Sequence, residues 1–173
     1  EDKPYIVYLA SSPFIAANQE VAFVRKWISH IRQSNNPILS DIGILVRPHP
    51  QNAKLWADED LSEFGNVALY PREGANPVKE ASQADFYESI YYSQAAIGIN
   101  SSAQIEAGII GKPVFTILDD SFSSTQEGTL HFEHLRRHNF LQVAKDLDSH
   151  LQQLLITLTD ESAQTDYNRE FIT

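Results

Sequence analysis

Residues 95–114 read Ala-Ala-Ile-Gly-Ile-Asn-Ser-Ser-Ala-Gln-Ile-Glu-Ala-Gly-Ile-Ile-Gly-Lys-Pro-Val. An apolar run typical of a buried strand is followed by a hydroxyl-rich turn, a short helical pattern and a second apolar run. This alternation predicts a βαβ corner in a parallel sheet. The free amides at a helix start carry partial positive charge, so Ser101 and Ser102 stand where backbone N–H groups and hydroxyls would hold a phosphate or carboxylate.

The same alternation extends along the whole chain. Continuous apolar runs at residues 5–9, 42–46, 67–70, 95–99, 114–118 and 140–143 predict strands, and helical patterns cover residues 19–31, 54–64, 86–93, 103–110 and 147–158. Because the strands are continuously apolar and separated by helices, we expect an α/β fold. Its sheet is predicted to be doubly wound, mostly parallel and Rossmann-like, with helices on both faces, in a single domain spanning residues 1–173. Methionine is absent even at position 1, and we expect a fragment of a larger two-domain protein.

Composition limits the classes of partner. The 173 residues carry a formal net charge of -10, which argues against binding to nucleic acid or to an anionic membrane surface. No apolar run approaches the roughly 20 residues that a membrane helix requires, so we expect no integral membrane segment. Cysteine is absent, which excludes disulfides and thiolate metal sites. We expect a cytoplasmic location, with any attachment to the inner membrane supplied by the rest of a parent protein.

In doubly wound sheets, ligands lie beyond the carboxyl ends of the strands. Four segments in such positions are rich in polar groups: Ser11-Ser12, Arg47-Pro48-His49-Pro50, Asn100-Ser101-Ser102, and Asp119-Asp120 with residues 125–132. We expect all four to face one edge of the sheet. The two adjacent aspartates lack a third ligand, so we predict no metal site.

His49 is placed between two prolines directly after a predicted strand. Its backbone is restricted on both sides, so the imidazole extends from a stiff loop. Beside Arg47, it is suited to bind a pyrophosphate or to protonate a leaving phosphate. In the alternative interpretation, His49 caps a turn and Arg47 pairs with an acidic neighbour.

The helix that follows Ser101 has two chemical features. Ser101 and Gln104 fit a capping box, which is a structural role. Ser102 and Glu106 are four residues apart and share a helix face, so a carboxylate lies one turn beyond the predicted phosphate site. There it can accept both hydroxyls of a ribose. The alternative is a solvated charge near a helix start.

Residues 125–132 contain many polar groups close to Gly128. We predict a loop that closes over the ligand, with Gln126, Thr129 and His131 as donors. An ordinary surface loop is the alternative.

Together, His49-Pro50, Ser101-Ser102 and the run Glu106-Ala107-Gly108-Ile109-Ile110-Gly111-Lys112-Pro113 resemble the carboxyl-terminal, nucleotide-sugar-binding half of GT-B glycosyltransferases. Similar His-Pro and Ser-Ser motifs occur in bacterial capsule and surface-polysaccharide transferases. The resemblance implies that His49, Ser101 and Ser102 contact the donor phosphates, with His49 acting catalytically on the leaving phosphate, and that Glu106 contacts the ribose.

From this resemblance we expect the donor half of a metal-independent glycosyltransferase of surface or capsular polysaccharide synthesis. Its substrate is a nucleotide sugar, it needs no cofactor, and its partner is an amino-terminal acceptor half. The predicted nucleotide-binding set is Arg47, Asn100, Ser101, Ser102, Glu106, Gln126 and Thr129.

Two alternative functions stay open. One is a domain related to the UDP-N-acetylglucosamine 2-epimerases, which share the fold and a similar Glu-bearing helix. The other is a non-catalytic nucleotide- or polysaccharide-binding module.

Overall fold

The computed structural model describes residues 3–16, 18–73, 79–127, 129–137 and 140–160. At its centre is a six-stranded sheet with the order β3-β2-β1-β4-β5-β6, in which every pairing is parallel. The strands are β1 (Tyr5–Leu9), β2 (Gly43–Arg47), β3 (Val67–Leu69), β4 (Ala96–Ile97), β5 (Val114–Ile117) and β6 (Leu141–Ala144). The strand order reverses between β1 and β4, which is the point where open α/β sheets form a crevice for ligands.

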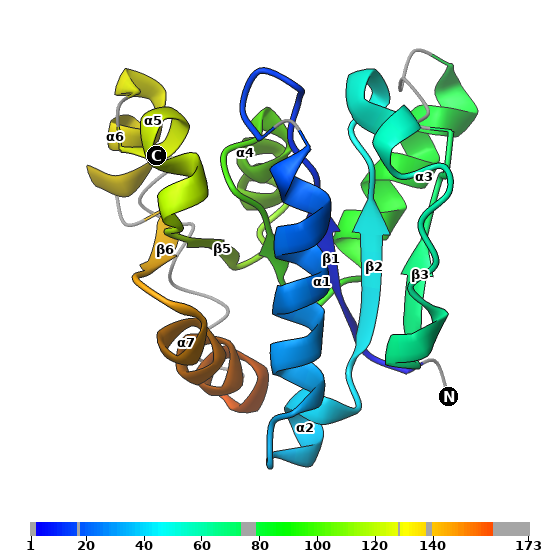
Figure 1. Ribbon diagram of the computed structural model, residues 1–173, viewed down its shortest axis with the longest axis vertical. Coiled ribbons are helices and arrows are strands. Elements are labelled where there is room, and N and C mark those ends of the chain that lie inside the picture. Colours follow the sequence, from blue (N-terminus) through cyan, green and yellow to red (C-terminus); the bar gives the residue numbers. More distant parts are fainter. Residues whose placement is uncertain (1–2, 17, 74–78, 128, 138–139, 161–173) are drawn as a thin grey trace.

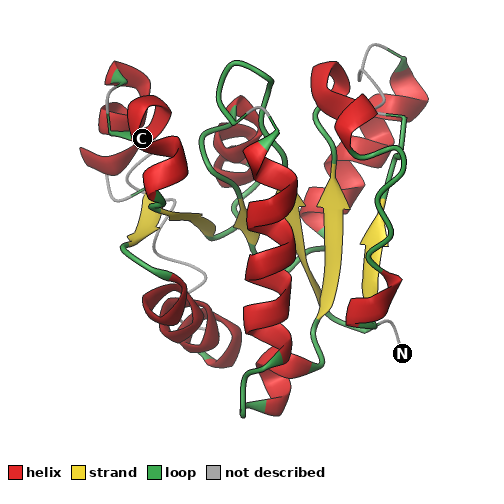
Figure 2. Cartoon of the chain, in the orientation of Figure 1, coloured by secondary structure: helices red, strands yellow, loops and turns green. Residues whose placement is uncertain are grey.

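Helices cover both faces of this sheet (Figure 1; Figure 2). On one face lie α1 (Gln19–Arg32), α2 (Pro37–Ser40) and α7 (Leu147–Thr159). On the other lie α3 (Glu80–Tyr91), α4 (Ser102–Ile109) and α6 (Leu130–Arg137). Short helical segments join them: η1 (Pro50–Leu55), η2 (Ser62–Phe64), η3 (Asp120–Phe122) and α5 (Ser123–Gln126). The prediction of a doubly wound, Rossmann-like α/β fold is confirmed.

Strand β1 shows why the strands of this sheet are continuous apolar runs in the sequence. Ile6 and Tyr8 enter the core beneath α1, whereas Val7 and Leu9 enter the core beneath α3 and α4. All four are buried, so both faces of the strand require apolar side chains and the sequence does not alternate between polar and apolar residues. Each such side chain contributes roughly 1.5–3 kcal/mol when it leaves water.

Gly111 lies at the end of α4, directly after the C-cap residue Ile110. Gly111 has a positive φ of 96°, and the Lys112 N–H donates to the Ala107 carbonyl at 3.0 Å. Within the same helix, Gly108 lies against the ring of Phe140, which would overlap any Cβ at this position.

Three segments differ from the sequence-based expectation. Residues 54–64 do not form one weak helix, because Pro50 starts η1 earlier and the chain turns again at η2, which ends at Gly65 with a φ of 71°. Helix α3 starts at Glu80 instead of residue 86, since its early turns are polar and carry no apolar periodicity. The loop predicted over residues 125–132 is not one continuous loop, because residues 125–126 belong to α5 and residues 130–132 to α6.

Among the described residues, no helix combines the length and the apolarity that crossing a membrane requires.

Candidate functional site

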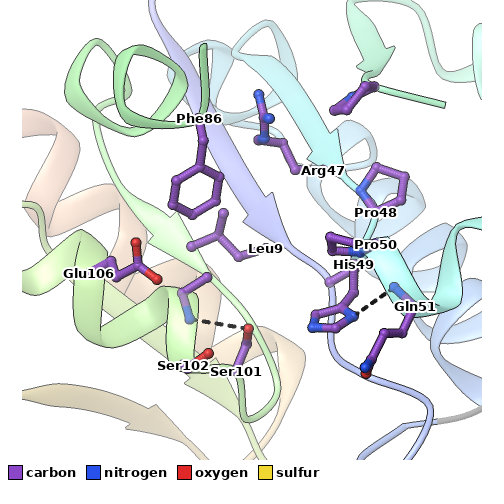
Figure 3. A pocket seen from close by; sticks show the side chains of 13 residues that line it. Leu9, Arg47, Pro48, His49, Pro50, Gln51, Phe86, Ser101, Ser102 and Glu106 are labelled. Carbon is purple, nitrogen blue, oxygen red and sulfur yellow. Dashed lines mark hydrogen bonds between the residues drawn. The ribbon is translucent and has the colours of Figure 1, made fainter. Parts of the chain in front are cut away.

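Two adjoining cavities lie at the carboxyl edge of the sheet, and residues that follow β1, β2 and β4 line both of them. Each has a volume of about 310 Å3. His49, Ser101 and Ser102 line both of them. The first is also lined by Leu9, Ala10, Arg47, Pro48, Pro50, Gln51, Pro71, Phe86, Ala103 and Glu106, and the second by Ser12, Ile15, Asn100 and Thr129. Figure 3 shows the first cavity between α4 and the turn that follows β2.

The amino-terminal end of α4 is held rigidly. The Ser101 N–H donates to Gln104 Oε1 at 2.9 Å, and Ser101 Oγ accepts the Ala103 N–H at 3.3 Å, which completes the predicted capping box. Gln104 Nε2 donates to the Phe115 carbonyl at 3.1 Å, which ties the cap to β5. Gly98 makes room for this amide, because a Cβ there would lie 2.8 Å from Gln104 Cδ.

Ser102 follows the cap and is exposed at the cavity. Among the described residues, nothing accepts its backbone N–H or its hydroxyl hydrogen. Because the capping box satisfies the neighbouring amides, Ser102 supplies the donors that a ligand can reach, at the positive end of the helix dipole.

His49 presents a defined tautomer to both cavities. Its Nδ1 accepts the Gln51 N–H at 3.2 Å, as Figure 3 shows, so the proton of the neutral ring lies on Nε2. Burial lowers the pKa of the imidazole, which keeps the ring neutral at physiological pH. The turn-capping interpretation of His49 is therefore confirmed, and it leaves Nε2–H as a donor.

Arg47 is 5% exposed, and its guanidinium is already paired. Its Nη2 donates to Asp85 Oδ2 at 2.9 Å, and the group lies 5.4 Å from the ring centre of Phe86. The alternative interpretation, in which Arg47 pairs with an acidic neighbour, is confirmed. Arg47 therefore lines the cavity with its charge balanced by α3.

Glu106 extends from the exposed face of α4, opposite the turn that carries His49 (Figure 3). Its carboxylate has no hydrogen-bond or ion-pair partner within the described ranges. The cavity thus has a free acceptor one helical turn away from the free donors of Ser102.

Asn100 and Thr129 form the wall of the second cavity. Asn100 Nδ2 donates to the Thr125 carbonyl at 2.7 Å and lies 3.5 Å from Thr129 Oγ1. Thr129 Oγ1 accepts the Phe132 N–H at 3.3 Å and so caps α6. These contacts hold α5 and α6 against the site, and both side chains still reach the cavity surface.

Gln126 lies away from both cavities. It is fully buried, its Nε2 donates to the Ile117 carbonyl at 2.9 Å, and its Oε1 accepts the Asp119 N–H at 3.3 Å. These bonds occupy the amide within the fold, so Gln126 anchors the end of β5 instead of extending from a loop. The side chain of His131 lies outside the described residues.

Several lining residues carry no motif that would reveal them. Leu9 and Phe86 supply an apolar wall, and Phe86 also lies under the Arg47 guanidinium. Asp85 belongs to a helix whose start was predicted too late, so the sequence did not identify it as the acidic partner of Arg47.

No family model and no curated protein sequence matches this chain. Solved structures match its fold. The UDP-GlcNAc 2-epimerase of Methanocaldococcus jannaschii, in complex with UDP-GlcNAc and UDP, superposes with a TM-score of 0.59 and 14% identity, over 92% of this chain and 40% of its own. Staphylococcus aureus MnaA, with UDP, superposes with a TM-score of 0.59 and 16% identity, over 98% of this chain and 40% of its own. The Neisseria meningitidis UDP-GlcNAc 2-epimerase, bound to UDP-GlcNAc, superposes with a TM-score of 0.54 and 11% identity, over 99% of this chain and 43% of its own.

The fold is similar to one half of a UDP-GlcNAc 2-epimerase. This chain spans about two fifths of the length of those relatives. The expectation of a GT-B-type half domain is confirmed at the level of the fold. These structures are 11–16% identical to this chain and show the fold alone, so both epimerisation and glycosyl transfer stay predictions at this point.

Proposed function

We propose that this chain binds the nucleotide part of a UDP-sugar, as the nucleotide-binding half of a sugar-nucleotide epimerase. The observation that carries the proposal is the meeting of Ser102 at the start of α4 with the Nε2–H of His49 in one cavity at the switch point. The similar epimerases, which bind UDP or UDP-GlcNAc, support the choice of ligand.

The diphosphate is assigned to the start of α4. The Ser102 N–H and hydroxyl and the Nε2–H of His49 are donors, and phosphate oxygens are acceptors. Arg47 is neutralised by Asp85, so hydrogen bonds and the helix dipole hold the anion instead of a free cation. This arrangement suits a chain with a net charge of -10, in which anion binding has to be local.

The ribose is assigned to Glu106. A carboxylate with no partner among the described residues can accept hydrogen bonds from hydroxyls, and the two ribose hydroxyls are vicinal donors. The apolar wall of Leu9 and Phe86 faces the same space and would exclude water from it.

Charge develops on the leaving nucleoside diphosphate when its bond to the sugar breaks. The preorganised donors of Ser102 and His49 would stabilise that charge without reorganising. Both epimerisation through a departing nucleotide and glycosyl transfer use this step. The His-Pro and Ser-Ser motifs keep glycosyl transfer as the second candidate. Incubation of the parent protein with UDP-GlcNAc and no acceptor separates the two, because only an epimerase then converts the sugar.

Isothermal titration calorimetry with UDP, CDP, GDP and CMP tests the binding proposal. We expect UDP to bind most tightly, and a flat titration with all four would refute the proposal.

A variant of Glu106 tests the ribose assignment. Glu106→Gln should weaken UDP binding while leaving the affinity for 2',3'-dideoxy-UDP unchanged, because that analogue lacks both hydroxyls. Glu88→Gln, which changes an exposed carboxylate of α3, is the matched control. Equal losses with both nucleotides would remove Glu106 from the sugar.

A further inference from the structure

A buried carboxylate that belongs to none of the motifs lies beneath the loop after β1. Glu20 is in the first turn of α1, and its side chain is fully buried. Its two oxygens accept the Ser11 N–H at 2.9 and 3.0 Å, and Oε1 also accepts the Tyr8 hydroxyl at 3.1 Å. Asn18, the residue before α1, makes no side-chain cap of its own. The carboxylate of Glu20 is thus committed to the loop.

This loop forms part of the candidate site. Ser12, directly after the amide that Glu20 holds, lines the second cavity together with Ile15. The Ile15 N–H donates to the Ser12 carbonyl at 3.0 Å, and the Ile15 carbonyl accepts Thr125 Oγ1 at 2.8 Å. The loop is therefore fixed at its start by Glu20 and further along by α5.

The contact suits a carboxylate better than an amide. Ser11 N–H and Tyr8 O–H are both donors, and an ionised carboxylate offers only acceptors. A buried charge is costly unless it is hydrogen-bonded, and the Ser11 and Tyr8 donors supply these bonds to Glu20.

We propose that Glu20 is a positioning residue for the ligand cavity, which fixes the Ser11 amide and thereby holds Ser12 and Ile15 against the bound nucleotide. This inference rests on the proposed function and assigns to the same site a dependence on pH.

Burial raises the pKa of Glu20 to about 7, against the hydrogen bonds from Ser11 and Tyr8, which lower it. The titratable group that faces it from β1 is Tyr8, whose pKa is raised well above its ordinary value, so this hydroxyl stays a neutral donor. The buried residues of α1 one turn after Glu20, Phe23 and Val24, are apolar. Ionisation of Glu20 around neutral pH therefore tightens the loop, and its protonation loosens it.

His49, which lines both cavities, should have the opposite effect of pH on nucleotide affinity. Protonation of its imidazole at lower pH would strengthen phosphate binding, whereas protonation of Glu20 would weaken it. Only a variant can separate the two contributions.

The test measures the affinity of UDP-GlcNAc between pH 6 and 8 by calorimetry, because its diphosphate has no ionisation in that range. Wild-type affinity should rise by about five-fold from pH 6 to 8, the lower end of usual coupling energies. Glu20→Gln should bind weakly at pH 8 and lose that rise, while Glu20→Asp, which keeps the charge, should retain part of it. Glu88→Gln should behave as the wild type.

Hydrogen exchange at the Ser11 and Ser12 amides gives a readout that needs no ligand. At each pH, these amides should exchange more slowly in the wild type than in Glu20→Gln, and the difference should grow above pH 7. The control Glu88→Gln should show the protection of the wild type. Equal protection, or the same pH profile of affinity in both proteins, would overturn the inference. If the wild type does not bind UDP-GlcNAc but shows the exchange difference, the proposed function fails and the role of Glu20 in the loop stands.

Discussion

Replacing His49 separates the capping role that the structure shows from the ligand-binding role that we propose for the same ring. Nδ1 caps η1 by accepting the Gln51 N–H, and Nε2–H is left for the ligand. Loss of a cap costs about 1 kcal/mol of folding free energy. Loss of a hydrogen bond to a charged phosphate costs about 1.5–3 kcal/mol of binding free energy, which is roughly a 10- to 150-fold change in affinity.

His49→Ala should lose both contributions, whereas His49→Asn should lose only the second. Asparagine is a good capping residue, and its short side chain accepts the Gln51 N–H without reaching the ligand. We therefore expect both variants to bind UDP about 10- to 150-fold more weakly. We expect only the alanine variant to unfold at lower denaturant concentration.

Calorimetry with UDP and denaturant unfolding of the three proteins measure both quantities. Wild-type affinity in both variants would show that Nε2 does not contact the nucleotide, and the site would have to be redrawn without His49. Equal unfolding of alanine and asparagine variants would instead contradict the capping role.

Three further predictions concern the framework. Gly108→Ala gains about 1 kcal/mol of helix propensity but forces a methyl into the buried Phe140 ring, which costs about 1–3 kcal/mol. We expect a net loss of stability in denaturant unfolding, reversed when Phe140→Leu is added. Asp85→Asn should destabilise the protein by about 1.5–3 kcal/mol in the same assay, because it leaves the Arg47 guanidinium without its anion. Burial lowers the pKa of His150 to about 3, so its contribution to stability is present above pH 6.5 and is lost as the pH falls toward 3. His150→Leu should therefore resist acid better than the wild type, by about 3 kcal/mol at pH 4 in thermal or denaturant unfolding.

Much of the framework was open to prediction because its signals are local. The strands are apolar on both faces, so continuous runs mark them, and the α4 cap needs only Ser101 and Gln104 at the correct spacing. The meeting of His49 with the two serines also followed from topology, since carboxyl ends of parallel strands share one edge.

The polar groups that turn inward could not be predicted in this way. Gln126 has the composition of a loop donor, yet it is buried because the carbonyls at the end of β5 need a partner. The pairing of Arg47 with Asp85 joins residues that only the sheet order brings together.

Local pattern was therefore enough for the α/β class, the helix start that offers its amides and the edge on which ligands would lie. Tertiary structure was needed to show which polar side chains form hydrogen bonds inside the fold and which can still bind a ligand. Gln126 and Glu20 are hydrogen-bonded inside the fold, whereas the side chains of Ser102 and Glu106 have no partner within the described part of the chain. The reason is physical: burial of a polar group depends on partners distant in the chain, and spacing along the sequence does not record them.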